Sequence, residues 1–205
     1  MHQAMKAALA IFTRVPEAGR VKTRLAPLLG GEGALAAHCA LVEDTLQRLG
    51  AQPDIEPTMW VDGEPNARVR LWQQRFALPV REQKGEGLGA RMAYALADAL
   101  ANGVYGLVVG TDCPPIDGPY VSRALAALRD HDVVFGPAED GGYGLVGLRR
   151  PCPDLFLNVA FGTDRALADT LHNAIRARRR VALLPAIWDV DEPGDWQRWQ
   201  ASASA

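Results

Sequence analysis

The sequence Tyr105–Gly106–Leu107–Val108–Val109 runs directly into Gly110–Thr111–Asp112–Cys113–Pro114–Pro115. Its first five residues form the clearest apolar strand pattern of the chain, and such a pattern is typical of a strand at the centre of a parallel sheet. In open α/β sheets, ligands bind in a crevice outside the carboxyl ends of the strands. The stretch therefore predicts a central strand that places the Asp112 carboxylate at a ligand crevice.

Apolar runs and amphipathic stretches alternate along the rest of the chain, as in βα units around a mostly parallel sheet. Strands are expected at residues 9–12, 58–61, 78–80, 105–109, 133–135, 144–148, 181–184 and 187–190. Helices are expected at residues 35–49, 69–76, 92–100, 121–128 and 166–177, and a short helix bearing tryptophan follows residue 195. A hairpin around residues 139–143 breaks the alternation, so the sheet should be mixed. We expect a three-layer α/β/α sandwich in a single domain over residues 1–205, with a core at about 7–199 and short frayed termini.

The composition is that of an ordinary globular protein: 48% of the 205 residues are hydrophobic, 22% are charged, and the formal net charge is −2. A general nucleic-acid binder would carry a basic face, so this class is disfavoured. No apolar run has the length of a membrane span, and the N-terminus lacks a secretory signal pattern. The odd number of widely spaced cysteines, Cys39, Cys113 and Cys152, points to a reducing compartment, and we expect a cytoplasmic protein.

A basic loop follows the first apolar run. Residues 13–25 carry four cations and one acid, and proline and glycine interrupt them. The cations are Arg14, Arg20, Lys22 and Arg24. Backbone N–H groups and Arg or Lys side chains of such loops hold phosphate at the carboxyl edge of a sheet. The alternative is a solvated surface loop, which is the interpretation we prefer for Arg20.

Acidic side chains end other expected strands. Asp112 is suited to bind Mg²⁺ or Mn²⁺ through oxygen, which leaves coordination sites for phosphate; otherwise it caps the turn before the two prolines. Asp189 and Asp191 alternate along the last expected strand and so point to the same side. Paired carboxylates repel unless a cation or hydrogen-bond donors lie between them. The alternative for Asp191, as for Asp195, is to cap the helix that follows.

Asp140 lies in the segment Glu139–Asp140–Gly141–Gly142–Tyr143. Its glycines suit a plain hairpin turn, whereas its acids suit a general base or the binding of an acceptor hydroxyl. His38 and His172 lie on expected helices, where we expect them to pack or to face solvent. The basic run at residues 176–180 follows a helix end, where cations suit the helix dipole, and receives no function here.

Two other nucleotide-binding patterns compete with this interpretation. Residues 85–90 fit the dinucleotide pattern G-x-G-x-x-[GA], and Asp112 lies at the distance of a ribose-binding acid. However, the strand before this pattern is short and ends in the polar residues 81–84, which are unsuited to a central strand. Gly19 and Lys22–Thr23 match part of a P-loop. A P-loop also requires an adjacent Gly–Lys pair and an earlier glycine, and both are missing here.

Five motifs together resemble a bacterial family of glycosyltransferases whose members are assigned mostly from sequence. They are Phe12-x-x-x-Pro16-x-x-Gly19-x-Val21–Lys22–Thr23–Arg24–Leu25, Gln83-x-Gly85-x-Gly87–Leu88–Gly89-x-Arg91–Met92, Gly110–Thr111–Asp112–Cys113–Pro114, Asp140–Gly141–Gly142–Tyr143 and Asp189–Val190–Asp191. The resemblance implies the nucleotide-diphospho-sugar transferase fold, the Rossmann-like GT-A arrangement. More distantly, the chain is similar to nucleotidyltransferases that build molybdenum-cofactor dinucleotides and that guanylate phospholactate.

The resemblance also implies roles for individual residues. Lys22, with Arg14 and Arg24, would neutralise a diphosphate and stabilise it as it leaves, so that Lys22 counts as catalytic. Asp112 and Asp191 would hold Mg²⁺ or Mn²⁺ as the cofactor. The nucleotide would further be bound by Gln83, Gly85, Gly89 and Arg91.

The expected activity is the metal-assisted transfer of a sugar from a nucleotide-diphospho-sugar to a small-molecule acceptor, with Asp140 as general base. A nucleotidyltransferase that uses an NTP and releases pyrophosphate is the nearest alternative, and a non-catalytic nucleotide-binding regulator is another. Glycosyltransferases of this fold usually carry Asp-x-Asp at the metal, whereas Gly110 stands two residues before Asp112 here, which bears on metal dependence. The nucleotidyltransferases usually open with a glycine-rich loop, and the lone Gly19 favours sugar transfer. We expect no nucleic-acid partner and no membrane span.

Overall fold

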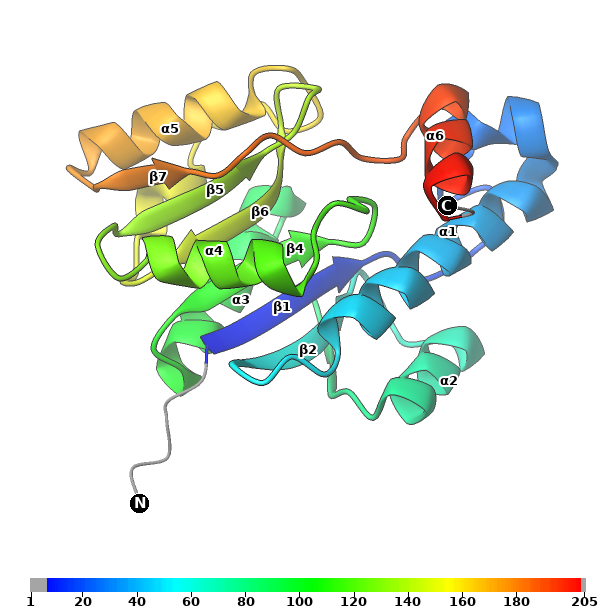
Figure 1. Ribbon diagram of the computed structural model, residues 1–205, viewed down its shortest axis with the longest axis horizontal. Coiled ribbons are helices and arrows are strands. Elements are labelled where there is room, and N and C mark those ends of the chain that lie inside the picture. Colours follow the sequence, from blue (N-terminus) through cyan, green and yellow to red (C-terminus); the bar gives the residue numbers. More distant parts are fainter. Residues whose placement is uncertain (1–6, 204–205) are drawn as a thin grey trace.

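The fold is built on one sheet of seven strands, with helices on both sides (Figure 1). This computed structural model describes residues 7–203. The strands are β1 (Ala7–Thr13), β2 (Ile55–Val61), β3 (Val80–Glu82), β4 (Gly106–Gly110), β5 (Val133–Pro137), β6 (Tyr143–Leu148) and β7 (Val181–Leu183). The α-helices are α1 (Ala26–Leu49), α2 (Ala67–Phe76), α3 (Gly87–Asn102), α4 (Gly118–Ala127), α5 (Ala166–Arg176) and α6 (Pro193–Ala203). Two short 3₁₀ helices are η1 (Thr23–Leu25) and η2 (Pro153–Phe156).

The strand order β3-β2-β1-β4-β6-β5-β7 places a ligand crevice beside β1. β1 pairs in parallel with β2 on one side and with β4 on the other. The chain winds outward from β1 to β3 and then returns to the far side of β1 as β4, so the order reverses between β1 and β4. Such a switch point opens a crevice at the carboxyl ends of the strands. Among the described strands β6 alone runs antiparallel to its neighbours, so the expected mixed sheet is confirmed.

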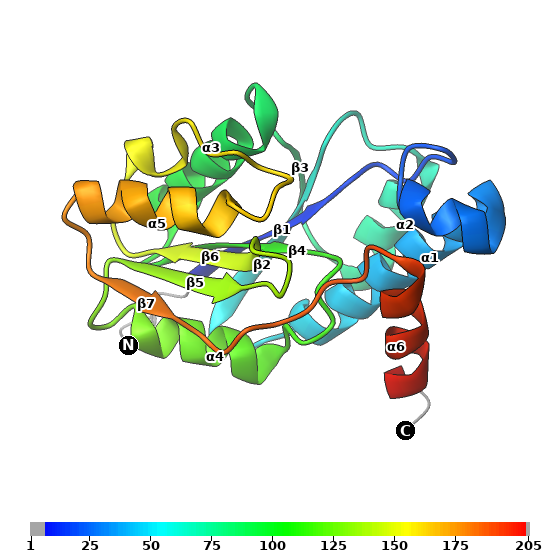
Figure 2. The same cartoon turned by 90° about the horizontal axis from the view of Figure 1, so that it is seen from above.

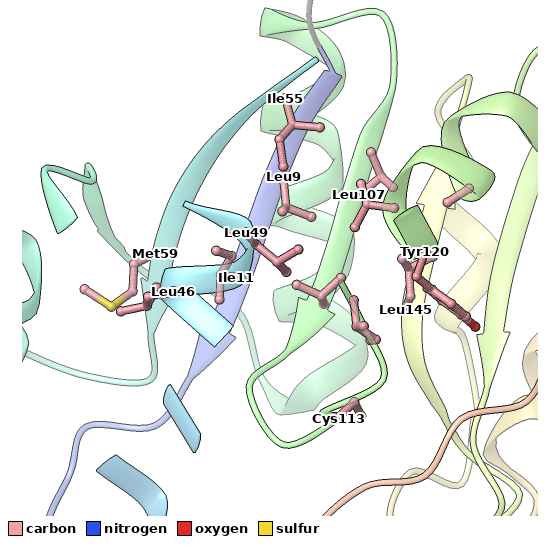
Figure 3. Close-up of a cluster of buried hydrophobic side chains, with 14 of the residues drawn as sticks. Leu9, Ile11, Leu46, Leu49, Ile55, Met59, Leu107, Cys113, Tyr120 and Leu145 are labelled. Atoms are coloured by element: carbon pink, nitrogen blue, oxygen red, sulfur yellow. The ribbon is translucent and has the colours of Figure 1, made fainter. Parts of the chain in front are cut away.

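Side chains of β1 alternate between the two faces of the sheet. Leu9 and Ile11 pack with residues of α1, α2 and α4, whereas Phe12 packs on the other face with residues of α3, η2 and α5. Figure 3 shows Leu9 and Ile11 in one cluster with Leu46 and Leu49 of α1. Figure 2 shows the layers from above, with α3 and α5 on one side of the strands and α4 on the other. The expected three-layer arrangement is therefore confirmed.

α1 is broken near its start. Gly30 has a φ of +72° and a ψ of 172°, which are not helical, so a short first segment is separated by a kink from the rest. The later part carries the buried face that the sequence predicts, and Gly50 ends the helix as expected. The span Thr23–Leu49 has a length and hydropathy that would suit a membrane span. That is a weak indication, because a helix in the core of a globular protein has the same properties, and α1 packs on the sheet here.

Residues 187–190 do not form the expected last strand. Ile187 makes one parallel bridge to Ala138, just beyond β5. The backbone N–H of Val190 then donates to the carbonyl oxygen of Asp112, at 2.8 Å, so the segment has left the edge of the sheet and crosses to the end of β4. This crossing brings the chain that follows over the carboxyl ends of the central strands.

Two smaller expectations also differ from the structure. β3 begins at Val80 rather than at residue 78, because Val80 pairs with Met59 at the sheet edge, where Arg81 and Glu82 reach solvent. α6 continues to Ala203, although we expected a frayed tail from residue 201. Residues 1–6 and 204–205, which were also expected to fray, lie outside the described residues.

Candidate active site

A cleft of about 720 Å³ opens at the carboxyl ends of β1 and β4. Its walls come from the basic loop, the turn after β4, the β5–β6 hairpin, the segment before α5 and the segment before α6. The sequence-predicted residues that line it are Arg14, Lys22, Arg24, Gln83, Arg91, Asp112, Asp140 and Asp191. The fold therefore gathers residues from the whole length of the chain at the switch point.

Lys22 is the most buried charge of this cleft. Its backbone is left-handed, with φ +45° and ψ +41°, a conformation that costs a residue with a side chain about 1–2 kcal/mol. Its side chain is only 9% exposed, and Nζ lies 3.1 Å from Oδ2 of Asp112 and 3.6 Å from Oδ1 of Asp191. One ammonium thus holds two carboxylates that are distant in sequence. Residues held in strained conformations of this kind cluster at functional sites.

Arg24 and Asp195 position the second of these carboxylates. Nη1 of Arg24 lies 2.6 Å from Oδ2 of Asp191. The side chain of Asp195 accepts hydrogen bonds from the backbone N–H groups of Asp191, at 3.2 Å, and Glu192, at 2.8 Å. Asp195 thus lies in the first turn of α6 and binds backbone N–H groups before the helix, so it does not cap a helix that follows it, and the Asp191 carboxylate pairs with the two cations.

Lys22 and Asp112 are both charged in the folded protein. Burial would lower the pKa of Lys22, but the carboxylates of Asp112 and Asp191 outweigh it, so the pKa lies above its ordinary value. Burial would likewise raise the pKa of Asp112, and the ammonium of Lys22 reverses that effect, so the pKa lies below its ordinary value. The two groups therefore form an ion pair across the neutral pH range.

Asp189 is a carboxyl group of the cleft whose surroundings disfavour its ionised form. Burial, followed by the charges of Asp112, Asp140 and Asp191, raises its pKa to about 6, and Lys22 offsets only part of this. The sequence predicts that Asp189 and Asp191 point to the same side of the chain, but it indicates no role for Asp189. Its raised pKa means that burial and the neighbouring carboxylates disfavour its charge more than Lys22 favours it.

We expect Asp189→Asn to stabilise the protein at pH 7.5 and to have little effect near pH 4. The carboxyl group has an ordinary pKa of 3.8 but a pKa of about 6 when folded, so its ionisation costs stability as the pH rises between these values. The shift corresponds to about 3 kcal/mol, and partial exposure reduces the expected gain to about 1–2 kcal/mol. Thermal unfolding of both proteins over a pH series measures this. A difference that does not change with pH would contradict it.

His38 of α1 contacts the start of the basic loop and fixes its position. Nε2 of the buried His38 lies 3.2 Å from the carbonyl oxygen of Arg14, whose Nη1 donates to the carbonyl oxygen of Arg20 at 3.3 Å. Burial lowers the pKa of His38, so the ring is neutral and we assign the proton to Nε2 as the donor. Helical spacing correctly predicts a packing residue, but it carries no information on a contact with a distant loop. Arg20 is largely exposed, as expected, and pairs with Glu17 at 2.7 Å, but it also lines the cleft.

Gln83 and Arg91 line the cleft, but the protein itself engages their side chains. Nε2 of Gln83 donates to the carbonyl oxygens of Thr13, at 3.1 Å, and Trp60, at 3.0 Å, and so joins the ends of β1 and β2. Nε of Arg91 donates to the carbonyl oxygen of Gly85 at 3.3 Å. These contacts leave the carbonyl oxygen of the Gln83 side chain and the end of the Arg91 guanidinium for a ligand.

Gly85 and Gly89 are not among the residues that line the cleft. Gly85 has a φ of +123°, and a Cβ there would lie 2.8 Å from Cβ of Ala90. A Cβ on Gly89 would lie 2.8 Å from Cε2 of Phe161 and 3.0 Å from Cβ of Phe156. The packing within the protein is thus sufficient to require both glycines, and their approach to a nucleotide stays a prediction. They allow a tight turn and the close packing of α3 against the segment before α5.

Asp140 lies at the exposed tip of the β5–β6 hairpin and lines the cleft. Its Oδ1 accepts the backbone N–H of Gly142 at 2.9 Å, so the turn that the glycines predict is present. Oδ2 makes no hydrogen bond within the described part of the chain. One carboxylate oxygen thus fixes the turn while the other is open to the cleft.

The sequence matches one known protein family. A model of bacterial proteins, described as an uncharacterized protein conserved in bacteria (DUF2064), matches residues 45–163, which is more than half of the chain. The chain belongs to the DUF2064 family. No curated protein matches the sequence of this DUF2064 protein.

Solved structures resemble the DUF2064 protein over most of its length. A candidate nucleotide-diphospho-sugar transferase from Desulfovibrio desulfuricans G20 is 31% identical, with a TM-score of 0.82 over 90% of this chain and 82% of that one. A 4-diphosphocytidyl-2C-methyl-D-erythritol synthase from Anaerococcus prevotii has a TM-score of 0.66 at 12% identity, over 98% and 97%. Glucosyl-3-phosphoglycerate synthase from Mycobacterium tuberculosis, solved with Mn²⁺, UDP and glucosyl-3-phosphoglycerate, has a TM-score of 0.61 at 11% identity, over 95% and 75%. The nucleotide-diphospho-sugar transferase fold is confirmed, and an enzyme is indicated.

The predicted metal ligands of this DUF2064 protein have the right chemistry for a hard cation. Mg²⁺ and Mn²⁺ prefer carboxylate oxygens, and Asp112 and Asp191 both approach one point. The Nζ atom of Lys22 lies at that point. Within residues 7–203, no group of three or more His, Cys, Asp or Glu side chains is arranged to hold a metal. The donors therefore fit a divalent cation in charge and type, but binding requires Lys22 to move aside.

Proposed function

We propose that this DUF2064 protein transfers a sugar from a nucleotide-diphospho-sugar to the hydroxyl group of a small-molecule acceptor. One observation carries the proposal: Lys22 is buried between Asp112 and Asp191 in a cleft at the switch point between β1 and β4. In open α/β sheets, nucleotides bind at such a switch point. An ammonium and neighbouring guanidinium groups are suited to phosphate. A cleft with one cationic and one acidic wall suits a diphosphate together with a cation better than it suits an anion alone.

Lys22 and Arg24 would bind the diphosphate by exchanging partners. Both cations are now paired with the carboxylates of Asp112 and Asp191, and phosphate oxygens would replace those carboxylates. Negative charge grows on the diphosphate as its bond to the sugar breaks, so cations placed there stabilise the transition state more than the ground state. Arg14, which lines the same cleft, adds a third positive charge.

The same exchange would release Asp112 and Asp191 to hold Mg²⁺ or Mn²⁺, with Asp189 as the next carboxylate. A divalent cation bound there supplies Lewis acidity to the diphosphate oxygens. The repulsion of Asp189 by Asp112 and Asp191, which together with burial raises its pKa, supports this assignment, because a cation among these carboxylates would relieve the repulsion. The Mn²⁺ in the structure of the mycobacterial glucosyl-3-phosphoglycerate synthase supports it through the shared fold.

Asp140 is our candidate for the general base. In the transfer, the acceptor oxygen attacks the anomeric carbon of the sugar, and the bond between this carbon and the β-phosphate oxygen breaks. The nucleoside diphosphate leaves with the bonding electrons, and the hydroxyl proton passes to the base. Oδ2 of Asp140 is suited to this role because Oδ1 is fixed by the hairpin and Oδ2 is free at the cleft.

A nucleotidyltransferase is the second candidate, and the shared fold supports it. The Anaerococcus synthase, whose name describes a diphosphocytidyl product, has a TM-score of 0.66 over 98% of this chain. In this reaction an acceptor phosphate oxygen attacks the α-phosphorus of an NTP and pyrophosphate leaves. Lys22 would again bind phosphate oxygens, and Asp112, Asp191 and Asp189 would again hold the divalent cation.

Product analysis distinguishes these functions. Purified protein is incubated with nucleotide sugars or with NTPs, each with Mn²⁺ and a mixture of small hydroxylated and phosphorylated acceptors. Release of nucleoside diphosphate supports the proposed sugar transfer, and release of pyrophosphate from NTP supports the second candidate. Binding without either product would contradict both and indicate a nucleotide-binding regulator.

We expect a nucleoside diphosphate to raise the unfolding temperature, and Mn²⁺ to increase this shift. A ligand at a hundredfold excess over its Kd adds about 2.7 kcal/mol, or about 5–10 °C for a chain of this size. Asp112→Asn should keep the metal-independent shift and lose the part that needs Mn²⁺. Asp54→Asn, at an exposed residue far from the cleft, is the matched control. No shift with UDP, GDP, CDP, ADP or TDP would contradict the proposal.

We also propose that the protein works in the cytoplasm. The cysteines Cys39, Cys113 and Cys152 are free thiols, as is usual in a reducing compartment. Fractionation of the native host tests this, and recovery from a secreted fraction would contradict it.

A further inference from the structure

We propose that the end of the molecule opposite the cleft docks on an anionic phospholipid membrane. Seven arginines gather at the end of the sheet where α5 runs into β7, at the left of Figure 1. We refer to them as the arginine pole. Its members are Arg129, Arg149, Arg150, Arg176, Arg178, Arg179 and Arg180. They are seven of the 22 cations of a chain whose net charge is −2, so about a third of its positive charge lies at this end.

Hydrogen bonds, several of them through Asp132, bring these residues together from three segments. The backbone N–H of Asp132, before β5, donates to the carbonyl oxygen of Arg180, before β7, at 2.8 Å. The backbone N–H of Arg149, after β6, donates to the carbonyl oxygen of Asp132 at 3.0 Å, and its Nη1 reaches the carbonyl oxygen of Arg129, after α4, at 2.6 Å. The pole therefore lies at the amino ends of β5 and β7, away from the carboxyl ends where the cleft opens.

The charge of the pole is largely uncompensated. Among the described ion pairs, the pole takes part only in that of Arg180 with Asp132, at 3.8 Å. The pKa of Asp132 is lowered, first by the backbone N–H of Arg180 and then by the charges of Arg180, Arg179 and Arg150. One acid thus faces several arginines. A surface of this kind attracts an anionic partner.

Two large aliphatic side chains lie exposed beside the arginines. Ile175, in the last turn of α5, is 68% exposed, and Leu183, in β7, is 54% exposed. Leu183 follows Val181 by two residues and so shares its face of the sheet, and Val181 packs against the buried cluster to which Ala174 of α5 belongs. The two aliphatic side chains thus belong to the same layer, next to the basic run. Isolated exposed aliphatics are common, but a pair flanked by arginines is less easily explained.

A phospholipid surface accounts for both features. Guanidinium groups bind phosphate with paired hydrogen bonds, and basic segments gain affinity for anionic lipid from each added cation. Ile175 and Leu183 would enter the boundary between headgroups and acyl chains. A second copy paired along the free edge of β7 would bring like charges together. A nucleic acid would offer no place for the aliphatic side chains, and the pole has no aromatic residue on which bases stack. Docking at this end would leave the cleft open to solution.

Vesicle binding of the full chain tests the proposal. Vesicles of phosphatidylcholine alone are compared with vesicles in which phosphatidylglycerol forms about a third of the lipid, at low and at high salt. We expect sedimentation with the anionic vesicles at low salt and release at high salt. Equal binding to both lipids, or no binding to either, would overturn the proposal, as would binding to RNA with none to vesicles.

Two sets of substitutions separate the contributions of charge and apolar surface. Arg150, Arg176 and Arg178 are exposed and make no ion pair or side-chain hydrogen bond with a described residue, so replacing all three by Gln should leave the fold intact. This variant should bind anionic vesicles about a hundredfold more weakly. Ile175→Ser with Leu183→Ser should weaken binding about tenfold. Unchanged binding in either variant, with thermal unfolding like that of the parent, would overturn the proposal.

α2 provides a matched control. It carries two exposed arginines, Arg68 and Arg70, next to Leu71, which is 56% exposed. Replacing these three by Gln, Gln and Ser should leave vesicle binding within about twofold of the parent, because the number of charges removed is similar but the position differs. An equal loss in this control would show binding by overall charge and would contradict docking at the arginine pole.

Discussion

Lys22→Ala is expected to lower kcat/KM for turnover of a nucleotide sugar by about a hundredfold to a thousandfold. The ammonium is buried, lies 3.1 Å from Asp112, and is the only cation that contacts both Asp112 and Asp191 among the described residues. Removing one donor that stabilises developing charge in a desolvated site has effects of about this size. The loss should also appear as weaker binding of the nucleoside diphosphate, because Lys22 holds phosphate in the ground state too. Steady-state kinetics and calorimetric titration measure the two effects.

Lys84→Ala is the matched control for this substitution. Lys84 is exposed, and its Nζ lies 5.5 Å above the ring of Tyr94, outside the cleft lining. We expect activity within about twofold of the parent, because an exposed charge contributes little. The Lys22 variant should also unfold more readily, by about 1–3 kcal/mol, since it leaves aspartates without their counter-charge. Undiminished diphosphate binding by the Lys22 variant would show that the phosphate site lies elsewhere.

Gly141→Ala is expected to lower the free energy of unfolding by about 2–4 kcal/mol and to reduce activity. Gly141 has a φ of +87°, and a Cβ there would overlap the backbone of Asp164, whose Cα would lie 2.8 Å away. The carbonyl oxygen of Gly141 also accepts the N–H of Leu167, in the first turn of α5, at 3.0 Å. The substitution would therefore separate the hairpin that carries Asp140 from the segment before α5. Thermal and chemical unfolding measure the change.

Gly162→Ala isolates the contribution of this contact. Gly162 also has a positive φ, +78°, but nothing lies within 4 Å of a Cβ built there. Its cost should therefore be the backbone strain alone, about 1 kcal/mol. Equal destabilisation by the two substitutions would mean that the contact between the hairpin and Asp164 contributes nothing.

Sequence patterns predicted most of the fold because they reflect which side chains are buried. Residues 105–109 are apolar throughout, and β4 lies in the middle of the sheet with both faces covered. The same property explains the error at residues 187–190. Ile187 and Val190 are buried as a strand pattern requires, but their burial comes from crossing the ends of other strands. Alternation cannot distinguish a strand from a buried extended segment that pairs with a neighbour at a single bridge.

The sequence named residues that the structure brings together, but it did not predict the contacts between them. The structure brings Lys22, Asp112 and Asp191 together, as the basic loop and the acidic strand ends indicated, while their catalytic roles stay predictions. That Lys22 directly pairs with both aspartates depends on a crossing segment that the sequence did not predict. The packing role of Gly89 was not predicted, because a glycine required by a packed Phe161 has the same sequence signature as one required by a ligand.

A crystal structure of the protein with a nucleoside diphosphate and Mn²⁺ would test the central claim most directly. We predict phosphate oxygens within hydrogen-bond distance of Nζ of Lys22, with the ion pair between Lys22 and Asp112 broken and the Asp112 carboxylate turned toward the cation. The diphosphate would lie at the carboxyl ends of β1 and β4. A diphosphate bound at the turn before α3, around residues 85–90, with the Lys22 ion pairs intact, would contradict the account and favour dinucleotide binding.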